Sequence, residues 1–192
     1  IITHDGVGAA VPEVWPVYSI DPNEPHVLDH GDLRMVMMDY NPILDRIVFG
    51  FNFYSARPNP FPTYGKVDLL VDVDNDGLVD YVFFNNNQNG IGVLDVANPD
   101  RIDSPFNLID YDFNSGTMFW SLTPVLYGMS PENSIIAFCV YSRDVAGNID
   151  FDSSCHRVNY LQRPFTAQVM PGTLSEEEQT AMLELQADSV AG

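Results

Sequence analysis

The sequence contains few basic residues, and this scarcity excludes several classes of partner. Lys and Arg number 8 against 27 Asp and Glu, which gives a formal net charge of -19. A surface this negative repels the phosphate backbone of nucleic acids and the headgroups of anionic membranes. It attracts divalent cations instead. The alternative is that most of these carboxylates serve only solubility.

Long hydrophobic runs and common catalytic motifs are also lacking. No stretch of about 20 apolar residues occurs, so the sequence predicts no membrane-spanning helix. Neither G-x-S-x-G nor H-E-x-x-H is present, and no paired-acid motif stands out. We therefore expect that this chain is not an enzyme.

Cysteine is scarce, with Cys139 and Cys155 the two examples. Cys139 lies in an apolar run, residues 134–141, and Cys155 follows a polar turn region. This separation fits two ends of one hairpin that a disulfide bridges. Two free thiols are the alternative. We favour the disulfide because the rest of the chain also has extracellular character.

Short apolar and aromatic runs, separated by clusters of Pro, Gly and Asn, predict β-structure almost throughout. With 45% hydrophobic residues the chain can bury a sizeable core. We expect an all-β protein, an immunoglobulin-like or jelly-roll β-sandwich. The expected strands are Asp32–Asp39, Arg46–Tyr54, Val67–Val73, Tyr81–Asn85, Gly116–Leu122, Ser134–Ser142 and Cys155–Leu161, with an edge strand at Val14–Ile20.

The two ends of the chain have a different character. Residues 1–29 are proline-rich and predict an extended lead-in to a sandwich domain at residues 30–170. Residues 171–192 form a tail, in which Leu174–Ala187 has the pattern of a short amphipathic helix. Ser175 and Glu178 make a capping box at its start. Whether this helix folds back on its own sheet or docks on a neighbour stays open.

The motif that carries chemistry is D-x-D-x-D-G-x-x-D at residues 72–80. Four carboxylates this close repel one another unless a cation is bound. Calcium takes six to eight oxygen ligands at about 2.3–2.6 Å, and alternating aspartates in a tight loop can supply them. A solvated acidic turn is the alternative. The predicted calcium ligands are the side chains of Asp72, Asp74, Asp76 and Asp80 and the backbone carbonyl of Leu78.

The residues around this motif exclude an EF-hand. An EF-hand has a bidentate Glu at its twelfth position, where this sequence has Phe83. The flanking segments VDLLV and YVFFN are strand-like. The motif is similar to the strand–loop–strand calcium sites of integrin-type repeats, which carry an aspartate at the ninth position. We therefore expect a calcium-binding β-hairpin.

Two other acidic regions are weaker candidates for a metal site. Residues 143–148 predict a hairpin turn held by side chain–backbone bonds, and whether Asp144, Asp150 and Asp152 form a second cation site stays open. A second region contains histidines, for which exposed loop residues are the favoured interpretation over a metal cluster. Its residues are His26, Asp29, His30 and Asp32.

From about Asp45 to Asp152 the order of features resembles a known family. The segments IVFGFNFYS, VDLLVDVDNDGLVDYVFFN and RDVAGN follow one another. They look like the accessory β-sandwich found C-terminal to the catalytic domain of some secreted bacterial subtilisin-like serine proteases. The resemblance implies an extracellular or cell-surface, non-catalytic module that calcium stabilises, for binding or structural support. Any protease activity would belong to a separate catalytic domain.

Two further functions are kept as alternatives. One is a self-assembling subunit of an extracellular filament or surface structure, a homo-oligomer joined through an exchanged terminal segment. The other is a carbohydrate-binding or glycan-active protein, for which Trp15, Trp120 and the tyrosines would supply a stacking platform. Most of these aromatic residues are better interpreted as core or strand residues.

Overall fold

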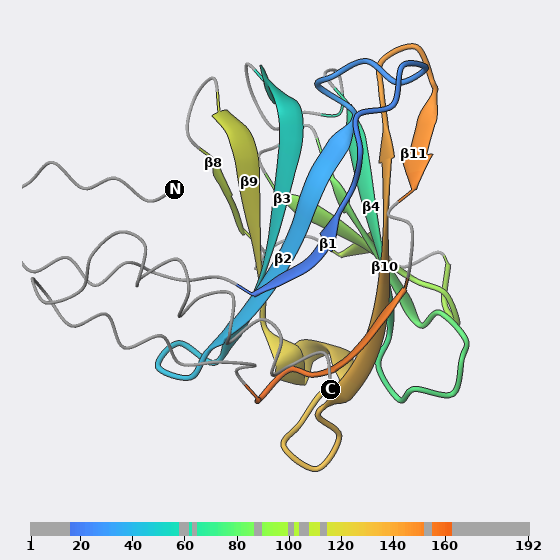
Figure 1. Cartoon of the computed structure of the whole chain (residues 1–192). Coiled ribbons are helices and arrows are strands. Elements are labelled where there is room, and N and C mark those ends of the chain that lie inside the picture. The colour runs from blue at the N-terminus through green and yellow to red at the C-terminus, as the bar shows by residue number, and fades with distance from the viewer. Residues whose placement is uncertain are drawn as a thin grey trace, which may run out of the picture. The chain divides into compact units, whose positions relative to one another are not determined.

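Two antiparallel β-sheets make up the part of the chain that the computed structural model describes (Figure 1). This part comprises residues 16–57, 62, 65–86, 90–99, 102–103, 108–111, 115–151 and 155–162. The prediction of an all-β sandwich is confirmed. The expected helix Leu174–Ala187 and the residue Trp15 lie outside the described residues.

The first sheet has five strands in the order β1-β2-β3-β9-β8. The central strand β3 is the longest, with 12 residues, and over most of Arg46–Arg57 buried side chains alternate with half-buried ones. The strands of this sheet are β1 (Val17–Ile20), β2 (Leu33–Asn41), β3 (Arg46–Arg57), β9 (Ser115–Leu122) and β8 (Leu108–Tyr111).

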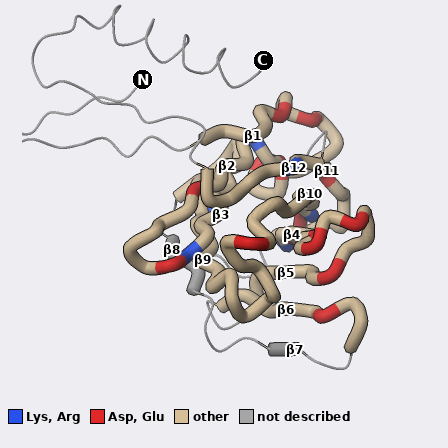
Figure 2. The backbone as a smooth tube through the Cα atoms, turned by 90° about the horizontal axis from the view of Figure 1, so that it is seen from below, with Lys and Arg blue, Asp and Glu red and all other residues tan. Residues whose placement is uncertain are grey.

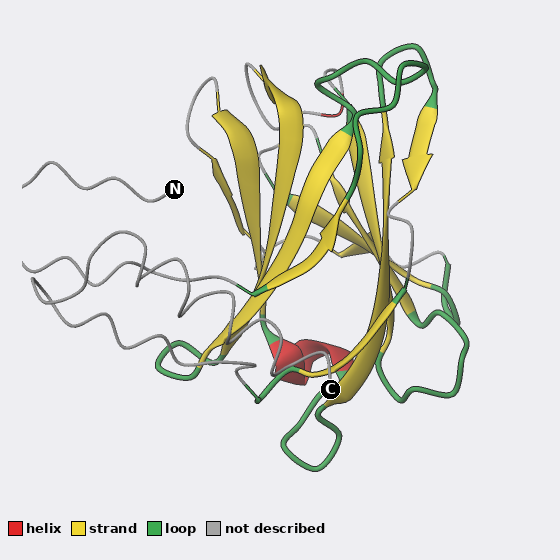
Figure 3. Ribbon diagram, viewed as in Figure 1, coloured by secondary structure: helices red, strands yellow, loops and turns green. Residues whose placement is uncertain are grey.

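The second sheet has the order β11-β10-β4-β5-β6-β7, and β12 also pairs with β10. A short 3-10 helix, Pro124–Tyr127, lies between β9 of the first sheet and β10 of the second (Figure 3). The strands are β11 (Ile149–Phe151), β10 (Ile135–Arg143), β4 (Lys66–Asp72), β5 (Tyr81–Asn85), β6 (Ile91–Asp95), β7 (Ile102–Asp103) and β12 (His156–Asn159).

The core lies between the two sheets and is rich in aromatic side chains. Phe49 of β3 contacts Phe138 of β10 edge-on, with ring centroids 5.2 Å apart, so the contact joins the two sheets. Phe51 and Trp120 make a similar contact at 4.8 Å between neighbouring strands. Burying one large apolar side chain contributes about 1.5–3 kcal/mol to folding. Trp120 is 0% exposed, so it serves the core and offers no surface for stacking a sugar.

The predicted disulfide is present between Cys139 and Cys155. Cys139 belongs to β10, and Cys155 immediately precedes β12, in which His156 is paired with Phe138. The Cα atoms of the two cysteines are 4.4 Å apart, within the range of native disulfides. Since β11 and β12 both pair with β10, the disulfide closes an interrupted β-hairpin, as the sequence predicts.

Residues Val17–Gln162 form one compact unit. Strand β1 belongs to this unit, because it pairs with β2 along one edge of the first sheet. Part of the segment expected as a lead-in is therefore an integral strand of the sandwich. Within the described residues, no helix has the length and apolar character needed to cross a membrane.

Candidate metal centre

The acidic loop at residues 72–80 joins the paired strands β4 and β5. Val71 is paired with Tyr81, and the N–H of Asp80 donates to the carbonyl of Val71 at 2.9 Å. The loop therefore lies within a β-hairpin and is not flanked by helices. Figure 2 shows acidic residues at this end of β4 and β5, in a sequence that has 27 acidic residues against 8 basic ones.

Three of the predicted ligands converge in this loop. One carboxylate oxygen from each of Asp72, Asp74 and Asp80 lies within 4.8 Å of the other two. Asp72 is buried, Asp80 is half-buried and Asp74 is exposed. The three oxygens thus meet at a position that opens to solvent on the side of Asp74.

Backbone N–H groups orient the buried carboxylate of Asp72. Its Oδ1 accepts hydrogen bonds from the N–H groups of Asn75 at 2.6 Å and Asp76 at 3.2 Å, and its Oδ2 accepts one from Gly77 at 2.8 Å. The curl that aims these groups inward requires positive φ angles of 60° at Asn75 and 92° at Gly77. Asn and Gly are the residues that adopt this conformation at least cost.

The carboxylate of Asp80 is also held in place, because its Oδ2 accepts the N–H of Val73 at 2.8 Å. Asp76 does not belong to the converging trio, and its Oδ1 accepts the N–H of Leu78 at 2.8 Å. The side chain of Leu78 has no donor atom, so only its backbone carbonyl could contribute a ligand. Ligation by all five predicted ligands stays a prediction, and for Asp76 and the Leu78 carbonyl the geometry adds no support.

The chemistry of this donor set suits one kind of ion. All the convergent donors are carboxylate oxygens. Hard divalent cations bind such oxygens more readily than softer metals do. Calcium tolerates irregular coordination and accepts water molecules to complete its shell. The residues therefore fit calcium at a solvent-accessible loop site.

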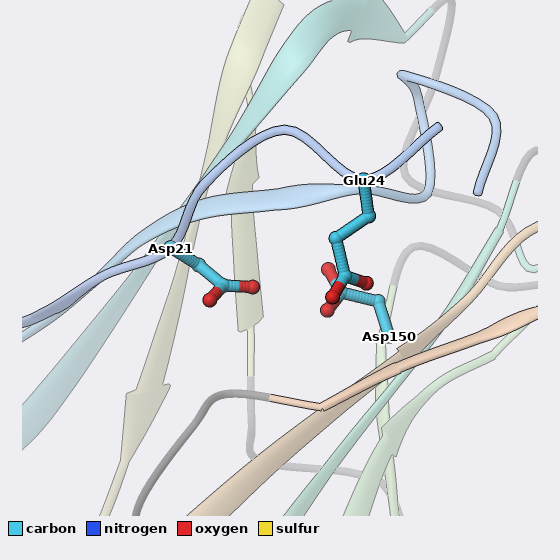
Figure 4. Close-up of side chains that lie close together, drawn as sticks. All are labelled: Asp21, Glu24 and Asp150. Carbon is cyan, nitrogen blue, oxygen red and sulfur yellow. The ribbon is translucent and has the colours of Figure 1, made fainter. Parts of the chain in front are cut away.

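A second acidic cluster brings together side chains that are far apart in the sequence. Asp21 and Glu24 follow β1, Asp150 belongs to β11, and one oxygen from each lies within 4.8 Å of the others. In Figure 4 the three carboxylates point toward one another. Asp21 is 5% exposed and Asp150 is 0% exposed. The sequence analysis considered Asp150 but did not connect it with Asp21 or Glu24.

Burial dominates the electrostatics of Asp150. Burial, the negative charges of Asp21 and Glu24 and a side-chain hydrogen bond with Asp21 together raise the pKa of the Asp150 carboxyl to about 7, while the hydrogen bond from the Leu33 N–H opposes the shift. Asp32, which is 0% exposed, likewise has its pKa raised, chiefly by burial. A cation bound at the cluster would offset the desolvation cost of the Asp150 carboxylate.

Asp144 has a different role from Asp150. Its Oδ2 accepts the N–H of Leu28 at 3.0 Å and the side-chain amide of Asn148 at 2.7 Å, and its Oδ1 accepts the Asn148 N–H at 2.8 Å. Burial alone would raise the pKa of Asp144, but these hydrogen bonds outweigh it and lower the pKa to about 2. Asp144 thus organises the turn after β10, and Asp152 lies outside the described residues.

His26 lies beside Glu24 of the second cluster, but within the described part of the chain neither it nor His30 belongs to a group of converging metal-ligand atoms. The Nε2 of His26 lies 3.8 Å from the Oε2 of Glu24, and the His26 side chain is 62% exposed. Among the described residues, the acidic groups able to hold a metal include neither His26 nor His30.

Comparisons with protein-family models, with curated proteins and with solved structures find no match to this chain. The resemblance to the accessory domain of subtilisin-like proteases therefore rests on the sequence motifs, and the two acidic clusters are interpreted from their own geometry.

Proposed function

We propose that this chain is a non-catalytic, extracellular β-sandwich module that calcium stabilises through the loop at residues 72–80. Its role would be binding or structural support. The observation that carries the proposal is the convergence of the Asp72, Asp74 and Asp80 oxygens within 4.8 Å of one another.

The position of the loop supports a structural role for the ion. The loop connects two strands whose last paired residues are Val71 and Tyr81, so a bound ion would hold the end of the β4–β5 hairpin in register. The side-chain amide of Asn133 donates to the carbonyl of Val73 at 3.0 Å, which links the loop to the segment before β10. Calcium binding would therefore stabilise more than the hairpin alone.

The disulfide and the charge support an extracellular location. Disulfides persist mainly in oxidising compartments, and Cys139–Cys155 is one. A formal net charge of -19 also suits surroundings rich in divalent cations. The filament hypothesis depends on terminal segments that lie outside the described residues, so it stays a prediction.

The proposal is tested by thermal unfolding of the wild type and of Asp74→Asn, each in calcium and in chelator. Asp74 is exposed, and asparagine keeps the Oδ1 that accepts the Asp76 N–H. At a calcium concentration about 100 times Kd, the wild type should gain about 2.7 kcal/mol of unfolding free energy. Asp74→Asn should lose most of this gain and should match the wild type in chelator.

Asp29→Asn is the matched control, because it removes one negative charge from another exposed position. It should keep the full gain in calcium. Equal stabilisation of Asp74→Asn and wild type by calcium would show that the loop is not the site, and the proposed function would then lose its main support.

A further inference from the structure

The segment between β1 and β2 connects the two sheets. Residues 21–32, here called the bridging loop, start and end in the first sheet but pack on strands of the second. The N–H of Leu28 donates to Asp144, and the hydroxyl of Ser142 donates to the carbonyl of Gly31. A Cβ at Gly31 would lie 2.7 Å from the Cα of Asp144, so only glycine allows this close approach.

The acidic cluster described above lies where the bridging loop meets β11. Asp21 and Glu24 come from the bridging loop, and Asp150 faces them from β11 of the other sheet (Figure 4). The main-chain N–H of Leu33, just after the loop, donates to Oδ2 of Asp150 at 2.5 Å. Three carboxylates that meet in a largely buried place destabilise the fold unless something offsets their charge.

A second, independent observation points to a ligand. Asp150 is 0% exposed, its Oδ1 receives no hydrogen bond from an N–H donor within the part of the chain that the structure describes, and its carboxyl is close enough to that of Asp21 for the two to share a proton. Native proteins rarely leave such an oxygen without a donor or a cation. Since the carboxylate points toward Asp21 and Glu24, a cation among the three would satisfy it.

The donor set selects the ion. The group consists of three carboxylates and includes no nitrogen or sulfur donor. Such a donor set favours a hard cation. Calcium suits it better than magnesium, because magnesium requires near-ideal octahedral geometry and retains its water. We propose that Asp21, Glu24 and Asp150 form a second calcium site, which fastens the bridging loop of one sheet to β11 of the other.

This site is separate from the loop at residues 72–80, so the two are tested independently. The experiment measures calcium stoichiometry by isothermal titration of the full chain after chelator treatment. The wild type should bind two ions, Asp150→Asn and Asp74→Asn should each bind one, and the double variant should bind none. If Asp150→Asn binds as many ions as the wild type, the second site is wrong.

The variants are designed to stay folded. Asparagine at position 150 keeps an oxygen for the Leu33 N–H and removes a buried negative charge, so Asp150→Asn should melt at or above the wild-type temperature in chelator. If it fails to fold by circular dichroism, Glu24→Gln at a half-buried position replaces it, and unchanged stoichiometry there overturns the proposal. Asp29→Asn, from an exposed position of the same bridging loop, should bind two ions.

The outcomes separate this inference from the proposed function. Binding that survives Asp150→Asn but disappears in Asp74→Asn rejects the second site and leaves the first intact. The reverse result rejects the first and keeps the second. If Asp150→Asn raises stability equally with and without calcium, the cluster is held by a shared proton rather than by a metal, and the inference is overturned.

Discussion

The aspartate side chains of this protein differ in role, because they differ in how many hydrogen-bond donors surround each carboxylate. Asp72 accepts hydrogen bonds from three backbone N–H groups, which orient its carboxylate without an ion. Asp150 accepts one, and its second oxygen has no donor among the described residues. Asp144 accepts several donors and needs no cation. The same type of side chain thus serves as a preorganised candidate ligand, as a buried carboxyl with one oxygen lacking a donor among the described residues, or as a turn-forming group.

The low pKa of Asp144 predicts a pH-dependent contribution to stability. Its folded-state pKa is about 2 against an ordinary value of 3.8, so the charged form stabilises the fold above about pH 4 and this contribution is lost as the pH falls toward 2. In Asp144→Asn, the side-chain NH2 would replace one of the two oxygens that accept hydrogen bonds from Leu28 and Asn148. We expect a loss of about 1–3 kcal/mol near neutral pH.

The measurement is urea unfolding of wild type and Asp144→Asn from about pH 7 down to about pH 2. The difference in unfolding free energy should shrink over the acidic part of this range, because both side chains are then uncharged. A difference that stays constant with pH would contradict the role given to the Asp144 carboxylate. Asp29→Asn should show little difference at any pH.

Only some of the site residues could be predicted from the sequence, and distance along the chain explains why. The proposed ligands of the loop at residues 72–80 lie close together in sequence, so their spacing alone makes them candidates. The second cluster depends on contacts such as that between Leu33 and Asp150, which are 117 positions apart. Without the pairing of strands, nothing in the sequence connects Asp21 with Asp150.

The strands that carry alternating aromatic and β-branched residues were predicted closely. Tyr81–Asn85 has the expected bounds, and β3 and β10 differ from expectation by few residues. Strand β6 was not predicted, since Gly92 interrupts a short run that follows an Asn-rich segment. A Cβ at Gly92 would lie 2.4 Å from the ring of Phe84, so the glycine is needed where the strands pack.

The β10–β12 disulfide predicts a stability effect at the level of these elements. The cysteines are 16 positions apart, and a crosslink closing a loop of this size stabilises by about 3 kcal/mol, because it restricts the unfolded chain. The double variant Cys139→Ser/Cys155→Ser should lose about this much unfolding free energy in urea.

Reductant supplies the control for that prediction. It should lower the stability of the wild type to that of the double serine variant and should leave the variant unchanged. If the oxidised wild type and the variant unfold at the same urea concentration, the disulfide does not contribute as argued.

At the scale of the whole molecule, the two acidic clusters lie at connections between elements of the sandwich. One cluster lies at the end of the β4–β5 hairpin, and the other lies between the bridging loop and β11. An excess of carboxylates destabilises a compact fold through self-repulsion unless cations offset it. Calcium at both places would turn part of this repulsion into stabilisation.

The central claim is that the loop at residues 72–80 binds calcium. The most direct test is a crystal structure of the full chain grown in calcium, with anomalous difference maps collected at a wavelength where calcium scatters anomalously. The account predicts a peak about 2.3–2.6 Å from carboxylate oxygens of Asp72, Asp74 and Asp80. A well-ordered loop without such a peak, at calcium concentrations that saturate other sites in the crystal, would contradict it.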